Sequence, residues 1–329
     1  MKDYKDLIDT VKNESQRRIP VGISACLLGQ EVRYNGGHKR SRYCLEVLSD
    51  CFEYEPFCPE VAIGLGIPRQ PIRLVGDAEN PMALGTDDPS VNVTQPLQES
   101  GERFAGRHSH LCGYILMKGS PSCGMERVKV YHRNGHPDGM GSGLFAKALM
   151  DAMPWLPVEE EARLNDHVLR ENFILRVFTL HCWKQQVEPE PTFHKIQQFH
   201  ARHKYTLMAH TYQGYRELGR YLAEAHSMPL EQLIPEYLNR LMGYLKKRAG
   251  RKSHTNTLLH IMGYLKKSID TQCKQELIDS IEQYRRGEVH LVVPLTLLKH
   301  YLRRYGNDYI NDQVYLDPYP HQLGLRNYI

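Results

Sequence analysis

The stretch IPVGISACLLG, residues 19–29, joins a short apolar run to a small-residue turn that carries Cys26. Its first six residues have the length and composition of a buried strand. Similar apolar runs recur further along the chain, each bounded by Gly, Pro or Ser: FEYEPF (52–57), PIRLVG (71–76), CGYILM (112–117) and RVKVY (127–131). Amphipathic stretches separate them. Strands that alternate with helices predict an α/β domain built on a Rossmann-like parallel sheet.

Two helical stretches and a proline-rich segment mark the end of this domain. GSGLFAKALMDAM (141–153) predicts a helix with Ser142 as its N-cap. Residues 159–183 predict a long closing helix. The EPEP segment (188–191) is the expected linker, because its prolines stiffen a polar stretch. The α/β domain is therefore expected to cover residues 16–185.

The rest of the chain, residues 186–329, has a different pattern. Apolar residues recur there at helical spacing, which predicts an all-α domain with helical stretches at 193–225, 230–250, 257–269 and 274–287. Residues 189–329 carry 20 Lys and Arg against 13 Asp and Glu, whereas residues 1–188 carry 22 against 25. This excess of positive charge indicates an anionic partner for the helical domain.

The composition excludes several classes of protein. Of the 329 residues 41% are hydrophobic, and the mean hydropathy of −0.52 is typical of globular proteins. The longest apolar run, residues 291–298, is far shorter than the roughly 20 residues that a membrane span needs. The charged segment 1–18 contains no apolar stretch, so we expect no signal peptide, no membrane partner and a cytoplasmic location. The eight cysteines then stay reduced. No oligomeric state follows from these features.

Three cysteines lie shortly after predicted strands: Cys26, Cys58 and Cys123. Ligands of open parallel sheets bind beyond the carboxyl ends of the strands, so these thiols are expected to converge at one edge. Three soft thiolates can hold an iron–sulfur cluster and leave one iron open as a Lewis acid. Zinc is the competing metal, although zinc sites favour paired CxxC motifs, which are absent here. The remaining alternative is that all three are buried apolar residues.

Three motifs around these cysteines carry a family resemblance: SACLLGQEVRYNGG (24–37), CPEVAIGLGIPRQP (58–71) and KGSPSCG (118–124). Together and in this order they resemble the bacterial thiouracil desulfidase family, over roughly residues 18–160. The helical half resembles the YbgA-like domain, notably in residues 199–210 and 254–267. The fused order is similar to that of bacterial desulfidases that convert 4-thiouridine in tRNA to uridine.

The resemblance implies a specific site. Cys26, Cys58 and Cys123 are expected to hold a [4Fe-4S] cluster whose fourth iron takes the sulfur of a thiocarbonyl substrate. Glu60 is implied as the catalytic acid–base group. Ser120 is the expected catalytic hydroxyl, with Ser122 as the less favoured choice.

Further residues near these motifs are expected to contact the substrate. Ser24 and Ser122 offer hydroxyl groups that can tune the charge on sulfur. Arg33 and Tyr34 belong to RYNGGHKR (33–40), a basic turn that can grip a phosphate. The alternative for this turn is a solvated basic loop.

The helical half contains a segment without acids. Residues 237–269 carry eight basic residues and no Asp or Glu. Lysines in the last turns of helices explain part of this pattern. RNA phosphates are the expected partner of the set, which comprises Arg240, Lys246, Lys247, Arg248, Arg251, Lys252, Lys266 and Lys267. The histidines at 200, 203 and 210 are expected to be core or RNA-facing rather than metal ligands.

The resemblance implies an enzyme that removes sulfur from 4-thiouridine in tRNA by cluster binding of the thiocarbonyl and Glu-assisted hydrolysis. Two alternatives remain open at this point. The same chemistry can act on free thiouracil or thionucleosides, or the protein can be a non-enzymatic iron–sulfur sensor that binds nucleic acid.

Overall fold

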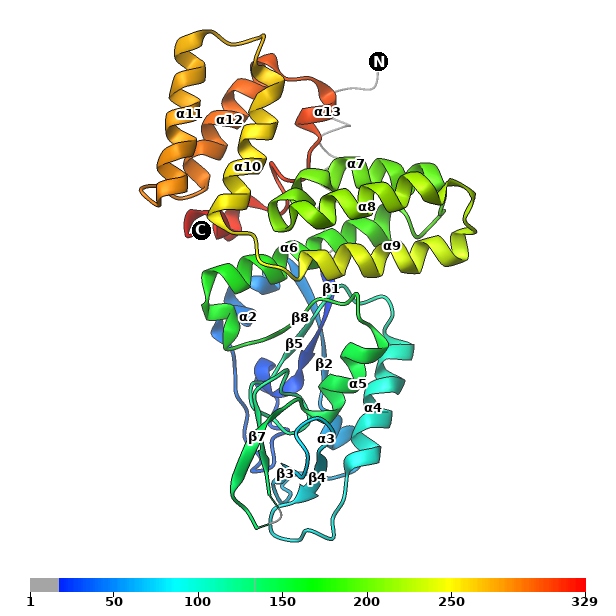
Figure 1. The fold of residues 1–329 in the computed structure, drawn as a ribbon. Helices are drawn as coiled ribbons and strands as arrows, with labels where there is room; N and C mark the ends of the chain where they lie inside the picture. The colour runs from blue at the N-terminus through cyan, green and yellow to red at the C-terminus, as the bar shows by residue number, and fades with distance from the viewer. Residues whose placement is uncertain (1–17, 133) are drawn as a thin grey trace. The chain divides into compact units, whose positions relative to one another are not determined.

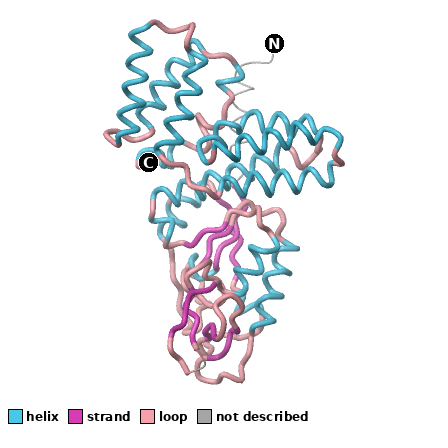
Figure 2. Tube along the Cα trace, viewed as in Figure 1, coloured by secondary structure: helices cyan, strands magenta, loops and turns pink. Residues whose placement is uncertain are grey.

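The computed structural model describes residues 18–132 and 134–329 and divides the chain into two compact units, Met1–Arg163 and Leu164–Ile329 (Figure 1). Residues 1–18 were the basis for expecting no signal peptide. Of these, only Arg18 lies within the described residues. Each unit has its own architecture, α/β in the first and helical in the second, as Figure 2 shows. The fold class predicted from the sequence is therefore confirmed.

The first unit is built on a four-stranded parallel sheet with the order β2-β1-β5-β8. Its strands are β1 (Ile19–Ser24), β2 (Phe52–Phe57), β5 (Tyr114–Leu116) and β8 (Val158–Glu160). Val21 and Ile23 of the inner strand β1 have no exposed surface. Parallel strands are covered on both faces, so they read as continuous apolar runs, which is why the sequence identified β1.

A second sheet holds two of the strands that were expected in the first. Its order is β4-β3-β6-β7, with β3 at Ile72–Val75, β4 at Met82–Gly85, β6 at Val128–Tyr131 and β7 at Pro137–Gly141. The inner pair β3 and β6 is parallel, whereas the edge strands β4 and β7 are antiparallel to their neighbours. Apolar composition reports that a strand is buried, but it does not specify which strand it pairs with. Placing 71–76 and 127–131 in the parallel sheet was therefore wrong.

Helices α4 (Thr94–Arg107) and α5 (Leu144–Ala152) lie side by side in the first unit (Figure 1). Two shorter helices in the described part of this unit are α2 (Arg42–Glu46) and α3 (Pro59–Ala62). The predicted N-cap Ser142 is wrong, because Gly143 occupies the cap position of α5 and no side chain caps the helix. Backbone carbonyls of a neighbouring loop take that role, as described below.

The second unit consists of helices. They are α6 (His167–Gln186), α7 (Phe193–His210), α8 (Tyr212–Glu224), α9 (Leu230–Leu245), α10 (Arg251–Met262), α11 (Thr271–Arg286), α12 (Val292–Tyr305) and α13 (Asp308–Asn311). The predicted stretch 193–225 is two helices, and the break falls at Thr211, whose backbone is extended. Gly214 lies inside α8, where a Cβ atom would come within 2.6 Å of the Tyr244 ring.

The boundary between the units differs from the expected one at residue 185. Residues 159–183 were expected to form one helix of the first domain. Val158–Glu160 is instead the edge strand β8, and α6 begins only at His167, because the Asp166 side chain accepts from the amides of Val168 and Leu169. Helix α6 contacts α7 and α9 and belongs to the helical unit. None of the helices in the described ranges is long and apolar enough to cross a membrane.

Candidate functional site

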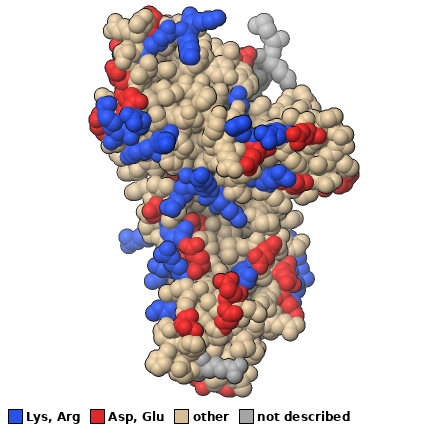
Figure 3. Space-filling model, in the orientation of Figure 1, with Lys and Arg blue, Asp and Glu red and all other residues tan. Residues whose placement is uncertain are grey.

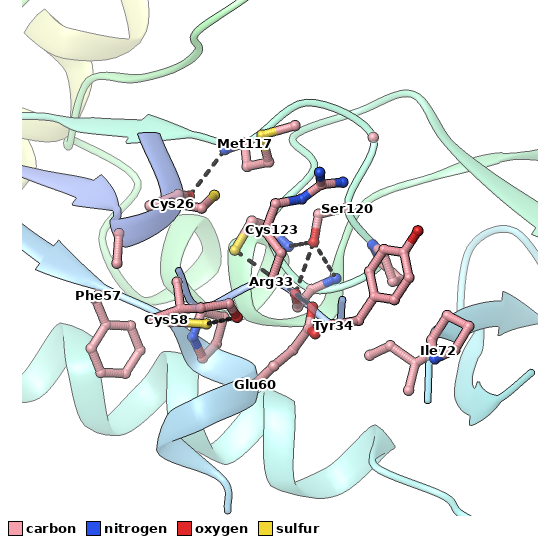
Figure 4. Close-up of a pocket in the computed structure, with 18 of the residues that line it drawn as sticks. Cys26, Arg33, Tyr34, Phe57, Cys58, Glu60, Ile72, Met117, Ser120 and Cys123 are labelled. Carbon is pink, nitrogen blue, oxygen red and sulfur yellow. Dashed lines mark hydrogen bonds between the residues drawn. The ribbon is translucent and has the colours of Figure 1, made fainter. Parts of the chain in front are cut away.

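A pocket of about 210 Å³ opens in the first unit beyond the carboxyl ends of β1, β2 and β5. Every site residue predicted for this unit lines it: Ser24, Cys26, Arg33, Tyr34, Cys58, Glu60, Ser120, Ser122 and Cys123. Figure 4 shows the three cysteine side chains gathered at one side of the pocket, with Tyr34 and Ile72 at the other. The expected convergence of three strand-end thiols at one sheet edge is therefore observed.

Cys26 sits in the short helical turn η1 (Ala25–Leu28), directly after β1. Gly29 ends this turn with a φ of +92°, a conformation that glycine adopts without strain. The chain then returns past the turn, and the amides of Lys39 and Ser41 donate to the carbonyls of Cys26 and Leu27, both at 2.9 Å. The loop that follows is thereby fixed against the cysteine, which is buried.

Cys58 follows β2 immediately and is the N-cap residue of α3, with Pro59 in the first helical position. Proline suits that position because its ring presets the helical φ and it has no amide to leave unpaired. The Cys58 thiol donates to the Val32 carbonyl at a donor–acceptor distance of 3.8 Å. Glu60 lies in the first turn of the same short helix, so this turn carries both a thiol and a carboxylate into the pocket.

Cys123 lies in a loop that is bonded to the start of α5. The amides of Gly143, Leu144 and Ala146 donate to the carbonyls of Gly124, Pro121 and Ser122 at 2.8, 3.1 and 3.1 Å. These bonds satisfy first-turn amides of the helix, so no side-chain cap is needed. A Cβ atom at Gly143 would lie 2.6 Å from the Ser122 carbonyl. The glycine therefore permits the close approach that holds the Cys123 loop in place.

The three thiols are poor acids in this environment. Burial, with a contribution from the neighbouring Cys58, raises the pKa of the Cys26 thiol to about 11. Burial also raises the pKa of Cys58, and it raises that of Cys123 with a further contribution from Glu60. Thiolates are the form that binds metals. Binding of a metal or cluster to these cysteines therefore has to release protons that the thiols hold tightly.

A hydrogen-bonded chain links Glu60 to the Cys123 loop. The Ser122 hydroxyl donates to Glu60 Oε1 at 2.5 Å and lies 3.8 Å from the Cys123 sulfur. The Ser120 hydroxyl is 2.9 Å from that of Ser122, and its oxygen accepts from the Cys123 amide at 3.1 Å. Ser122 is thus the hydroxyl in direct contact with the carboxylate, whereas Ser120 supports the loop. The resemblance favoured Ser120 over Ser122 as the catalytic hydroxyl, whereas the direct hydrogen bond to Glu60 comes from Ser122.

Arg69 is a residue of this site that is not among the predicted site residues. Its side chain is only 5% exposed, and both Nε and Nη2 donate to Glu60 Oε2, at 2.9 and 2.7 Å. Nη2 also donates to the Val32 carbonyl and Nη1 to the Gly66 carbonyl, each at 2.9 Å. Arg69 therefore connects the carboxylate to two loops. The available signal was an arginine and a glutamate in one motif, separated by a proline-containing turn.

The remaining predicted contacts occupy the walls of the pocket. Arg33 lies 5.7 Å from the centre of the Tyr34 ring, an arrangement that orients both side chains. Tyr34 is exposed and lines the pocket, so one side of its ring faces solvent or a ligand. The Ser24 hydroxyl accepts from the Met117 amide at 3.0 Å and thereby joins the ends of β1 and β5.

The donor set fits an iron–sulfur cluster better than a single ion. Three soft thiols line the pocket, and the pocket has room beyond them. Two thiolates on one zinc ion lie about 4 Å apart, because each Zn–S bond is about 2.3 Å long. Within the described residues, no group of three or more His, Cys, Asp or Glu side chains is arranged to hold one metal ion. Thiolates that bind different iron atoms of a cluster do not have to lie so close together.

Six of the eight predicted RNA-binding residues form two groups. Lys246, Lys247, Arg248 and Lys252 are exposed around the connection between α9 and α10, and Lys266 and Lys267 are exposed beyond α10. Figure 3 shows Lys and Arg side chains gathered at both places. Helix α10 has 12 residues and so separates the groups by about 18 Å. The single basic segment expected from the sequence is therefore two separate groups on the surface.

Two predicted RNA contacts have partners inside the unit. Arg251 is half-buried, donates to the carbonyls of Tyr284 and Val289 at 3.2 Å, and covers the Tyr284 ring. Arg240 is exposed, but it is paired with Glu236 and lies 4.2 Å from the centre of the Tyr221 ring. These contacts weaken the case for both arginines as phosphate ligands.

The three histidines singled out in the sequence, His200, His203 and His210, pack inside the helical unit. His203 and His210 are buried and their Nδ1 atoms bond to the carbonyls of Phe199 and Lys247 at 2.8 and 2.6 Å. His200 bonds to the Tyr237 hydroxyl at 3.0 Å. Burial lowers the pKa of each of the three to about 4, so they are neutral at physiological pH.

Comparisons with known proteins agree with the division of the chain into an α/β unit and a helical unit. The model of the 2-thiouracil desulfurase family matches residues 21–161, and a model described as a protein of unknown function, DUF1722, matches residues 204–320. The chain is 32% identical over 158 residues to the uncharacterized protein YbgA of Escherichia coli (strain K12), a match that covers 48% of this chain and 94% of YbgA.

Two further proteins are similar to about half of the chain. The uncharacterized protein YbbK of Bacillus subtilis (strain 168) is 31% identical over 153 residues, with 44% of this chain and 97% of YbbK covered. A solved structure of the [4Fe-4S]-dependent thiouracil desulfidase TudS shares 31% identity over 45% of this chain and 95% of TudS, with a TM-score of 0.37. The two matched models and the nearly full coverage of YbgA and YbbK show that the chain belongs to the 2-thiouracil desulfurase family, fused to a YbgA-like helical unit.

Proposed function

We propose that this protein removes the sulfur of a thiolated uracil and that its substrate is 4-thiouridine in tRNA, which becomes uridine. The observation that carries the proposal is the meeting of Cys26, Cys58 and Cys123 with Glu60 in one pocket. Family membership supports the desulfurising chemistry. The exposed basic groups of the helical unit support RNA as the carrier of the base.

The three cysteines would hold a [4Fe-4S] cluster as thiolates. When bound, the cluster supplies an iron without a protein thiolate, which prefers the soft sulfur of a thiocarbonyl to water or a carbonyl oxygen. The overall reaction replaces C=S by C=O, consumes one water and releases hydrogen sulfide, so no electron donor is required. The protein must therefore orient the base, position a water and move protons.

Glu60 is placed for the proton transfers. Arg69 holds Oε2, and Oε1 accepts from the Ser122 hydroxyl inside the pocket. Oε1 can accept a proton from an attacking water. The Ser122 hydroxyl can then donate its hydrogen bond to the reacting oxygen instead of to Glu60. General acid–base help of this kind contributes about 10²–10⁴-fold. The exposed ring of Tyr34 stands opposite the thiols, where a uracil can stack on it.

The test is anaerobic reconstitution of the full chain with iron and sulfide, followed by measurement of 4-thiouridine lost from bulk tRNA and of sulfide released. Cys26→Ala, Cys58→Ala and Cys123→Ala should each lose both iron and activity. Cys51→Ala is the matched control, because Cys51 is half-buried and does not line the pocket. Full iron content in all three pocket variants would contradict the assignment of ligands.

Two alternatives are decided by the same assay. Free thiouracil or a thionucleoside is the second candidate, favoured by a pocket that is small for a nucleotide. Turnover of the free base with none on thiolated tRNA would select it. A non-enzymatic sensor requires no carboxylate, so Glu60→Gln should then leave function intact. Loss of desulfuration by Glu60→Gln at unchanged iron content supports the enzyme.

A further inference from the structure

Three tyrosines of the helical unit come from separate elements and meet at its surface: Tyr205 of α7, Tyr264 of η5 (Gly263–Leu265) and Tyr309 of α13. The ring centres of Tyr264 and Tyr309 lie 6.1 Å apart with the planes tilted by 38°. The Tyr205 hydroxyl donates to that of Tyr264 at 3.4 Å. The three residues are far apart in sequence, so this cluster is a product of the tertiary fold.

The outer two rings of the cluster are accessible. Tyr205 is buried, whereas Tyr264 is 38% exposed and Tyr309 is 41% exposed. Most large apolar side chains of this unit are buried, and isolated exposed rings are common on protein surfaces. Two exposed rings in contact, held by a buried third, are instead a preformed aromatic surface. Holding them in place removes part of the entropy cost that a ligand otherwise has to overcome.

Positive charge surrounds this surface. Lys204 Nζ lies 4.7 Å from the ring centres of both Tyr205 and Tyr309. Lys266 and Lys267 follow Tyr264 by two and three residues, in the turn beyond η5, and both are exposed. Asp308 and Asp312 flank Tyr309 in sequence and oppose an anion there. The lysines are therefore the groups suited to phosphates, and the rings are suited to an uncharged flat group.

We infer that Tyr264 and Tyr309, with Lys204, Lys266 and Lys267, form a stacking surface for an unpaired RNA base and its flanking phosphates. The inference deepens the proposed function, because it rests on RNA as the partner of the helical unit. Aromatic rings next to basic side chains are how single-stranded RNA is bound without sequence readout. An acidic or apolar protein partner is the competing occupant.

The test compares fluorescence anisotropy titrations of the full chain with labelled bulk tRNA and with labelled oligouridylate. The double variant Tyr264→Ala/Tyr309→Ala should bind both RNAs about 5- to 150-fold more weakly, since one stacked base is worth about that factor. Tyr264→Phe/Tyr309→Phe keeps the rings and should bind within about 2-fold of wild type. Tyr328→Ala removes an exposed ring that stacks on His167 instead and is the control.

The salt dependence separates stacking from charge. The Ala variant should keep the wild-type slope of log affinity against log salt, whereas Lys266→Glu/Lys267→Glu should reduce it by about 0.7 for each single-strand phosphate that is no longer neutralised. A thermal unfolding midpoint measured for every variant identifies any loss caused by misfolding. Unchanged RNA affinity of a folded Ala variant overturns the inference, and so does an equal loss in the Phe variant.

The outcomes also distinguish this inference from the proposed function. If wild type removes sulfur from tRNA and the Ala variant binds tRNA equally well, the stacking surface is wrong and the function stands. If the Ala variant loses oligouridylate binding while wild type leaves thiolated tRNA unchanged, the stacking surface stands and the function is wrong. If wild type binds neither RNA, the stacking surface is overturned, and the competing occupant, an acidic or apolar protein partner, is favoured.

Discussion

Arg69 holds Glu60 by a single carboxylate oxygen: Nε and Nη2 both reach Oε2, at 2.9 and 2.7 Å, and Oε1 is left to Ser122. The carboxylate is thereby fixed in rotation without losing the oxygen that faces the pocket. The same guanidinium bonds to the Val32 carbonyl, which also accepts from the Cys58 thiol. One buried arginine therefore connects the acid–base group to the loop that packs on a cluster ligand.

Arg69→Lys should lower kcat for a free thiolated uracil by about 10- to 100-fold, because an ammonium group cannot form the planar fork that fixes Glu60. Iron content should stay near that of wild type. Arg103→Lys is the matched control, since Arg103 makes an exposed ion pair with Glu99 at 3.2 Å. Wild-type kcat in Arg69→Lys would show that the position of Glu60 does not depend on the fork.

Ser122→Ala and Ser120→Ala should behave differently. Ser122→Ala removes the donor to Glu60 Oε1 and should lower kcat by about 10-fold or more at unchanged iron content. Ser120→Ala removes the acceptor of the Cys123 amide and should mainly weaken iron retention. Steady-state kinetics and iron analysis on the same preparations check both. A larger loss of kcat in Ser120→Ala, with iron retained, would restore the assignment expected from the sequence.

Reversing charge in each basic group should reduce the salt dependence of tRNA binding separately. The groups lie about 18 Å apart along α10, so they bind different phosphates and their effects should add. Each phosphate that a variant no longer neutralises should lower the log–log slope by about 0.9 if it belongs to a duplex and by about 0.7 if it belongs to a single strand. The variants are Lys246→Glu/Lys247→Glu/Arg248→Glu and Lys266→Glu/Lys267→Glu.

The control for these variants is Arg285→Glu/Arg286→Glu, because both arginines are exposed but already paired with Glu282 and Glu288 at 2.6 Å. Turnover of a free thiolated base should be unchanged in every case. An unchanged slope in both test variants would exclude these groups as the RNA-docking surface.

The helical unit should lose stability as the pH falls from about 6.5 toward 4. Burial lowers the folded-state pKa of His203 and His210 to about 4, below the unfolded value of 6.5, so the unfolded state binds more protons in this window. The stabilisation is complete above pH 6.5. One unit of pKa shift corresponds to about 1.4 kcal/mol for each histidine.

The free energy of unfolding is measured by urea titration with the fluorescence of Trp183, which is buried in this unit. The measurement uses a Trp155→Phe background, so that Trp183 is the tryptophan that reports unfolding. His203→Leu should flatten the stability–pH curve between pH 6.5 and 4, whereas replacement of the exposed His260 should not. A curve for His203→Leu as steep as that of wild type would mean that His203 has the same pKa in the folded and unfolded states.

The α/β and helical classes, the strand β1 and the positions of the three cysteines could be predicted from the sequence, because each follows from local composition and from where a strand ends. An apolar run ended by Gly or Pro encodes a buried strand whatever its neighbours are. It did not encode that 71–76 and 127–131 pair in a second sheet, since pairing depends on contacts between distant segments. Nor did it place α6, where helical spacing continued across a short edge strand.

Contacts between side chains of the site could not be predicted from the sequence, because they depend on how distant segments fold together. Ser120 and Ser122 are two residues apart and chemically identical, so only the path of the loop bonded to α5 brings Ser122 to Glu60. Arg69 became part of the site through the same packing. A local sequence pattern predicts the secondary structure of one segment. A catalytic contact joins side chains of different segments, and the distance between them depends on how the whole core packs.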